Sequence, residues 1–189
     1  MADNDMIMIG GVRISFPHLF QRPIINGEEG KCGAALMLDP EKHAKAIAQI
    51  EEGISALCKE KLKGRKLPSD KLCLRDGADK GRTEYEGYQI LSANSKGKPL
   101  VIGGDGSTVI SSEEDSPIYA GCYVNAKVRL WAQDNKFGKR INSELVAVQF
   151  FKDGEPLDGS YVSAEDAMSG FGGIDGANDN EDGDDFLAA

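Results

Sequence analysis

Residues 118–151 read IYAGCYVNAKVRLWAQDNKFGKRINSELVAVQFF, and their pattern is that of a long β-hairpin. The first arm alternates with a period of two, as a strand with one buried face does. The loop 134–140 follows, and its Asn135 and Gly138 are able to adopt positive φ and reverse the chain. The return arm 141–151 is apolar on both faces for much of its length, which predicts a central strand. The apolar face of the first arm is formed by Val124, Ala126, Val128 and Leu130.

The opposite face of the first arm combines cations with aromatic side chains. A purely structural strand more usually carries Glu, Thr or Ser there. Cations neutralise phosphates and aromatic rings stack on bases, so this face and its loop predict a site for single-stranded nucleic acid. If four or five phosphates are neutralised, log affinity should fall with log salt at a slope of roughly −3. The predicted site residues are Tyr123, Asn125, Lys127, Arg129, Trp131, Lys136, Phe137, Lys139 and Arg140.

The net charge of −9 argues against such a site only until it is divided along the chain. All 22 Lys and Arg residues lie at or before Lys152, together with 20 of the 31 acids, so this body carries +2. The other 11 acids follow Lys152 without a base among them, so that segment carries −11. The acidity therefore belongs to the C-terminal end, and the body is able to bind a polyanion.

Length and composition suit one domain with appendages, because 189 residues with 40% hydrophobic content are enough for one core. No stretch resembles a secretory signal or a membrane span, so we expect a soluble intracellular protein. The four cysteines form no C-x-x-C pair and the two histidines are isolated. Reduced cytoplasmic thiols are therefore expected, with no metal site, no disulfide framework and no cofactor.

The rest of the body predicts further strands and one helix. Residues 6–16 form a strand bulged at Gly10-Gly11, in which Val12, Ile14 and Phe16 alternate with Arg13 and Ser15. Strands are also predicted at 31–38, 87–94 and 99–102, and loops at 20–30 and 67–83. The helix has Asp39 as its N-cap, Pro40 at N1 and an end near Gly64. These elements predict a small, mostly antiparallel barrel or sandwich with one prominent helix.

Two groups outside the hairpin are secondary candidates for binding nucleic acid. Five cations close the helix, and although cations there complement the helix dipole, five within eight residues exceed what capping requires. Two tyrosines beside Arg82 either extend the stacking surface or are ordinary half-buried side chains. The secondary candidates are Lys59, Lys61, Lys63, Arg65, Lys66, Arg82, Tyr85 and Tyr88.

The glycine cluster at 103–108 (GGDGST) does not qualify as a phosphate loop, because the lysine of a Walker motif is missing and no helical pattern follows. A flexible loop is the preferred interpretation. The acids at 113–115 likewise indicate a solvated turn, because no second cluster completes a metal site.

We expect a folded domain over 1–164 and a disordered acidic tail over 165–189. The tail has eight acids, no bases and few large apolar residues, so it cannot bury enough surface to offset its ordering entropy. Its end joins acids to a bulky apolar pair, which is typical of a peptide that docks in a pocket on a partner. A frayed terminus is the alternative. The docking residues would be Asp182, Asp184, Asp185, Phe186 and Leu187.

Five motifs carry a resemblance to known proteins: YAGCYVNA (119–126), WAQDNKFGKRIN (131–142), LVAVQ (145–149), DGEPL (153–157) and, more diffusely, RISF (13–16). Through them the chain resembles a family of tailed-phage single-stranded DNA-binding proteins, first catalogued as a domain of unknown function. The resemblance implies an OB-fold, binding of single-stranded DNA without strong sequence preference, a role in phage replication or recombination, and a location in the host-cell cytoplasm. It also likens the acidic end to tails that recruit replication enzymes, although here Leu187-Ala188-Ala189 follow Phe186.

Together these features predict a mostly β protein, α+β by content, with an elaborated OB-fold-like antiparallel barrel. Two other functions stay open. An enzyme acting on nucleic acid would need a metal or an acid–base cluster, and only scattered His and Cys are found. A protein-interaction scaffold would use the hairpin to bind an acidic partner, and the interleaved aromatic residues argue against it.

Overall fold

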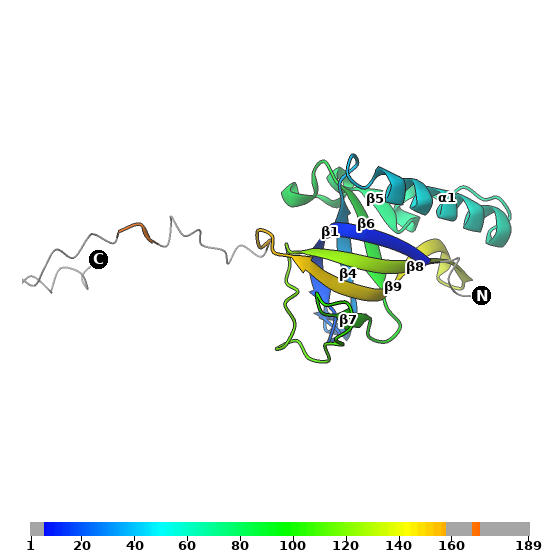
Figure 1. Cartoon of the computed structure of the whole chain (residues 1–189). Coiled ribbons are helices and arrows are strands. Elements are labelled where there is room, and N and C mark those ends of the chain that lie inside the picture. The colour runs from blue at the N-terminus through cyan, green and yellow to red at the C-terminus, as the bar shows by residue number, and fades with distance from the viewer. Residues whose placement is uncertain (1–5, 158–167, 171–189) are drawn as a thin grey trace, which may run out of the picture.

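The computed structural model describes residues 6–157 and 168–170. The predicted disordered tail and its docking residues, apart from 168–170, lie outside the described residues, as does the predicted domain end at 164. Figure 1 shows a β-barrel with one long helix beside it.

The five long strands close on themselves. β1 (Met6–His18) pairs with β4 (Gly33–Leu38) and β8 (Tyr123–Asn135), β4 pairs with β6 (Gln89–Asn94), and β8 pairs with β9 (Gly138–Lys152). A parallel contact between β6 and β9 completes the barrel. The predicted OB-fold-like barrel is therefore confirmed, with one closing contact that is parallel where an antiparallel sheet was predicted.

The hairpin of β8 and β9 is the largest unit of the barrel. Val124, Ala126 and Val128 are fully buried and Leu130 is partly buried against the core, which confirms the predicted inner face. The turn is tighter than predicted, because Asn135 pairs with Gly138, whose φ is +108°. β9 is a central strand as predicted: its other edge pairs first with β6 and then with β7 (Leu100–Ile102).

β1 shows one confirmed and one wrong prediction. Its pairing with β8 shifts between Ile9 and Val12, at the predicted Gly10-Gly11 bulge. The predicted alternation fails at the end of the strand, where Ser15 is buried and Phe16 is 43% exposed. The cause is a second irregularity between Ser15 and His18, where Phe16 adopts a φ of +49°.

Helix α1 (Ala44–Lys61) is shorter than predicted and begins after the predicted N-cap. The Asp39 carboxylate does accept hydrogen bonds from the amides of Glu41 and Lys42, but it caps a separate turn, and His43 is the N-cap of the helix. The end near Gly64 is confirmed, because the Gly64 amide donates to the Cys58 carbonyl oxygen. The helix lies against β8 and β1, with Ile50 fully buried (Figure 1).

Short elements fill the segments predicted as loops. β2 (Ile24–Ile25) and β3 (Glu28–Glu29) form a small hairpin. Three 3-10 helices (Ser69–Lys71, Gly77–Lys80 and Thr83–Tyr85) and β5 (Leu74–Asp76) occupy the segment between α1 and β6. That segment covers the outer side of the barrel with a second small core of Met37, Tyr85 and Ile90.

The described part of the chain contains no helix that is long and apolar enough to cross a membrane. It also contains no group of three or more His, Cys, Asp or Glu side chains placed to hold a metal ion.

Candidate nucleic-acid interface

A groove of about 600 Å³ opens between β6 and the half of the β8–β9 hairpin that leads to its turn. The 3-10 turn at Ser69–Lys71 and strand β5 form its other side. Trp131, which is 36% exposed, stands at the groove, and Glu144 is the one acid among the described residues that line it. Its cations are Lys31, Lys71, Arg75, Lys96, Arg129 and Arg140.

Hydrogen bonds hold two of these arginines in position. The Asp70 carbonyl oxygen accepts from Nη2 of Arg140 at 3.0 Å and from Nη2 of Arg75 at 3.1 Å. Nε of Arg75 also donates to the Leu72 carbonyl oxygen at 3.1 Å. Because these acceptors are uncharged carbonyl groups, both guanidinium groups keep their full charge for an anion in the groove.

The groove has an excess of positive charge. Nε and Nη2 of Arg129 donate to the Glu144 carboxylate, and Nζ of Lys71 lies 3.7 Å from Oδ2 of Asp70. The other four groove cations have no acidic partner in the described part of the chain. Lys80 lies at the edge, where Nζ donates to Oγ of Ser92 at 3.4 Å, and burial followed by the nearby Arg75 charge lowers its pKa.

The structure divides the predicted face of β8 between two places. Arg129, Trp131 and Arg140 meet in the groove. Tyr123 lies eight residues back along the strand, or about 26 Å at the usual rise of a β-strand, in a smaller cavity of about 130 Å³. Lys127 lies between the two places, beside Met8 of β1 and Ala147 of β9.

Asn125 has a structural role. Its Oδ1 accepts from the Gly11 amide at 2.9 Å, and its Nδ2 donates to Oε1 of Gln149 at 3.0 Å. These bonds tie the β1 bulge to β9 and use both ends of the side-chain amide. The predicted binding role of Asn125 finds no support in this geometry.

The tip of the hairpin carries the other predicted residues. Phe137 is 77% exposed, and Nζ of Lys136 lies 5.0 Å from the centre of its ring. Nζ of Lys139 is bound to Oδ2 of Asp134 at 2.6 Å. These three side chains extend the hairpin beyond the groove.

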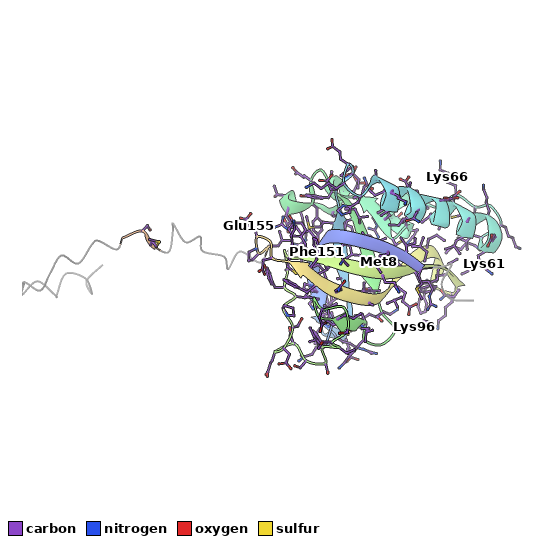
Figure 2. The ribbon with its side chains drawn as sticks, in the orientation of Figure 1. Met8, Lys61, Lys66, Lys96, Phe151 and Glu155 are labelled. Atoms are coloured by element: carbon purple, nitrogen blue, oxygen red, sulfur yellow. The ribbon has the colours of Figure 1, made fainter. Side chains whose placement is uncertain are left out.

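The secondary candidates do not line the groove. The five cations after residue 58 are exposed at the end of α1, where Figure 2 shows Lys61 and Lys66 projecting. Tyr85 is 3% exposed and its hydroxyl donates to Oγ of Ser15, so the idea that its ring stacks on a base is wrong. Tyr88 is half-buried beside the smaller cavity, and Arg82 lies over the Phe16 ring.

Four groove cations were missed from the sequence, because each stands apart from the hairpin in the chain. The places of Lys31 and Lys96 could have been found from the sequence. Gly33 pairs with Asn94, so Lys31 and Lys96 stand two residues beyond a pair at the same end of adjacent strands. No sequence pattern pointed to Arg75 and Lys71, because β5 was not expected.

The glycine-rich loop uses its own amides. Oδ1 of Asp105 accepts from the backbone nitrogens of Ser107 at 3.0 Å and Thr108 at 2.9 Å. The Thr108 hydroxyl, followed by these amides, lowers the pKa of Asp105 to about 2. A carboxylate therefore occupies the amides that a phosphate would need, which agrees with the loop interpretation.

Thiol reactivity provides a check on the groove wall, where Cys73 lies. Burial raises the pKa of Cys73 to about 11, so only about one molecule in a thousand holds the thiolate at pH 8. Cys58 is half-buried, whereas the other three cysteines are buried. We expect a disulfide reagent at pH 8 to modify one thiol of the native protein rapidly and all four after denaturation. A fast phase that persists in Cys58→Ser would contradict this assignment.

The family model described as "Enterobacter phage Enc34, ssDNA-binding protein" matches residues 5–187. The chain belongs to this family. A relative described as putative protein p50, from Acyrthosiphon pisum secondary endosymbiont phage 1, is 34% identical over 167 residues, which cover 84% of this chain and 89% of the relative.

Solved structures of the family agree with the fold. The single-stranded DNA-binding protein from bacteriophage Enc34 in complex with ssDNA is 31% identical, with a TM-score of 0.73 over 82% of this chain and 90% of that one. A second structure of the single-stranded DNA-binding protein from bacteriophage Enc34 gives a TM-score of 0.74 at 31% identity, over 88% of this chain and 91% of that one. Gp2.5 of bacteriophage T7, at 14% identity and a TM-score of 0.50, shares the fold.

Proposed function

We propose that this chain binds single-stranded DNA in the groove, without strong sequence preference. The observation that carries the proposal is the joining of Trp131 to six cations in one open groove. An aromatic ring stacks on any base and cations bind any phosphate, so this combination favours single strands over any particular sequence. The Enc34 protein, a member of the same family, has been solved with ssDNA, which supports the proposal.

The position of the groove on the barrel supports the same function. OB-folds bind oligonucleotides on the face of their second and third strands and on the loops flanking it. Here the second and third barrel strands in chain order are β4 and β6, and β6 provides Ser92 and Asn94 to the groove. Lys31, from the loop before β4, and the β8–β9 hairpin lie at the flanks.

In the cell, the protein would coat and protect single-stranded DNA during phage replication or recombination, in the host cytoplasm. A binder of this kind needs no catalytic group, so we do not propose an enzyme. A scaffold that binds an acidic partner is the second candidate, favoured only by the positive charge of the groove. Detection of a chelator-sensitive activity on DNA would instead support the hypothesis of a nucleic-acid-modifying enzyme.

Titration of labelled single-stranded and duplex oligonucleotides at several salt concentrations, followed by fluorescence anisotropy, tests the proposal. Four groove cations that have no acidic partner among the described residues predict a slope of log affinity against log salt of roughly −3 for the single strand. We expect tighter binding of the single strand than of the duplex. Failure to bind either oligonucleotide at low salt would favour the scaffold.

Removal of residues 165–189 is expected to tighten DNA binding several-fold at low salt and to abolish partner binding through the C-terminal residues. The segment carries eight acids and no bases, and its tether sets an effective concentration on the order of mM at the body, enough for weak competition with DNA. The same titration measures the change. A variant with these acids replaced by Asn and Gln is the control for length. Unchanged affinity at both low and high salt would refute the competition.

A further inference from the structure

Phe16 is exposed by a strained backbone. It is one of three non-glycine residues in the described part of the chain with positive φ, at +49°, and its side chain is 43% exposed. Regular alternation would bury this ring beside Ile14. A left-handed conformation is unfavourable for a residue with a Cβ, and such strain clusters at functional sites. The fold therefore holds a large aromatic ring outward where burial would have been the simpler outcome.

A cation already lies on this ring. The Arg82 guanidinium carbon is 4.4 Å from the centre of the Phe16 ring, and Nη1 of Arg82 is 3.3 Å from Oε1 of Glu84. Tyr85, the residue after Glu84, anchors the same segment by its hydrogen bond to Ser15. An aromatic ring with a guanidinium plane over it is a surface suited to a nucleobase, because both groups stack on bases.

A row of outward-facing residues joins this ring to the groove. The strand register places its members side by side across β8, β9, β6, β4 and β1, with the β6–β9 step set by the pairing of Ala93 with Ser143. Neighbouring strands lie about 4.8 Å apart, so the four steps span about 19 Å. The members are Trp131, Asn142, Ser92, Ala35 and Ser15.

Short side chains make the surface shallow in the middle of this row. Asn142, Ser92 and Ala35 have short side chains, and next to them Gly33 has no space for a Cβ, which would lie 2.3 Å from the Ala93 carbonyl oxygen. Tyr85 covers Ser15 at the far end, so the exposed aromatic group at that end is Phe16. The open part of the row is thus a shallow floor of Asn142, Ser92 and Ala35, with Trp131 at one end and, beyond the covered Ser15, Phe16 at the other.

We propose that Phe16 is a second base-stacking residue, and that a bound strand runs along this row from Trp131 to the Phe16–Arg82 pair. The inference rests on the proposed function and extends it, because it assigns a second stacking position and the path of the bound strand between the two positions. Lys80, bound to Ser92, and Arg82 lie beside this part of the row and are placed to meet the phosphates.

The first test compares Phe16→Gly with Phe151→Gly. Glycine adopts φ of +49° without strain, so Phe16→Gly preserves the local conformation. We expect it to weaken binding of oligo-dT about 5- to 150-fold, the effect of losing one stack, without changing the salt slope. Phe151, which is 54% exposed on the face of β1, β8 and β9 seen in Figure 2, is the control and should leave affinity unchanged. Thermal melting of both variants checks that the fold is retained.

The second test moves the sole tryptophan. In Trp131→Phe with Phe16→Trp, the new indole should be quenched by oligo-dT, whereas Trp131→Phe with Phe151→Trp should show no quenching. The inference would be overturned if Phe16→Gly bound with wild-type affinity and the indole at position 16 were not quenched. The proposed function would survive that result if oligo-dT still quenched Trp131 of the wild type. If no oligonucleotide binds the wild type, the proposed function itself has failed.

Discussion

Replacing Trp131 with alanine should weaken binding to single-stranded DNA by about 5- to 150-fold, because one base loses a stack worth roughly 1–3 kcal/mol. Trp131 is uncharged and 36% exposed at the groove, so its loss removes no phosphate contact. The slope of log affinity against log salt should therefore stay at about −3. Anisotropy titrations with labelled oligo-dT at four or more salt concentrations measure both quantities.

Trp131→Phe is the matched control, since it keeps an aromatic ring at the same place and should lose much less affinity. Equal losses in the two variants would mean that the size of the indole, and not stacking as such, determines affinity. A lower salt slope in Trp131→Ala would contradict the assignment, because it would mean that the substitution disturbed the cations around it.

Replacing both Lys31 and Lys96 with glutamine should have the opposite signature. These two exposed lysines stand at the same end of β4 and β6 and line the groove, and neither side chain has an acidic partner in the described ranges. Losing two of four phosphate contacts should reduce the salt slope from about −3 to about −1.5 and lower affinity roughly 25-fold near 0.1 M salt. The same titrations measure the change.

Lys63 and Lys66, replaced together by glutamine, form the control for net charge. Both are exposed beyond the end of α1 and outside the groove lining, so their removal should change the slope by much less. Figure 2 shows Lys66 beside the helix and Lys96 below it. Equal effects of the two pairs would show that DNA follows the general charge of the body instead of this groove.

The sequence was most informative where local pattern and burial coincide. Val124, Ala126 and Val128 alternate because β8 has one face in the core, and their burial was predictable. The central position of β9 was inferred correctly from its apolar residues, because both of its edges are paired. Its alternation shifts opposite two places in the partner strand, between Lys127 and Val128 and between Tyr123 and Val124, and these shifts were not visible without the register.

The site was only partly predictable, because it is assembled across strands that are far apart in sequence. Arg129 and Trp131 were recognised since they share one strand face with visible periodicity. Arg75 entered the groove through β5, a strand too short to give a period. Phe16 was assigned to the core by alternation, and only the backbone conformation at that residue shows that it points outward.

The central claim is that single-stranded DNA lies against Trp131, and the fluorescence of this sole tryptophan tests it most directly. Addition of oligo-dT to the full-length wild-type protein at low salt should quench the emission to a saturable limit, and added salt should restore it. Unchanged emission while an anisotropy signal reports a bound oligonucleotide would place the DNA elsewhere and contradict the account.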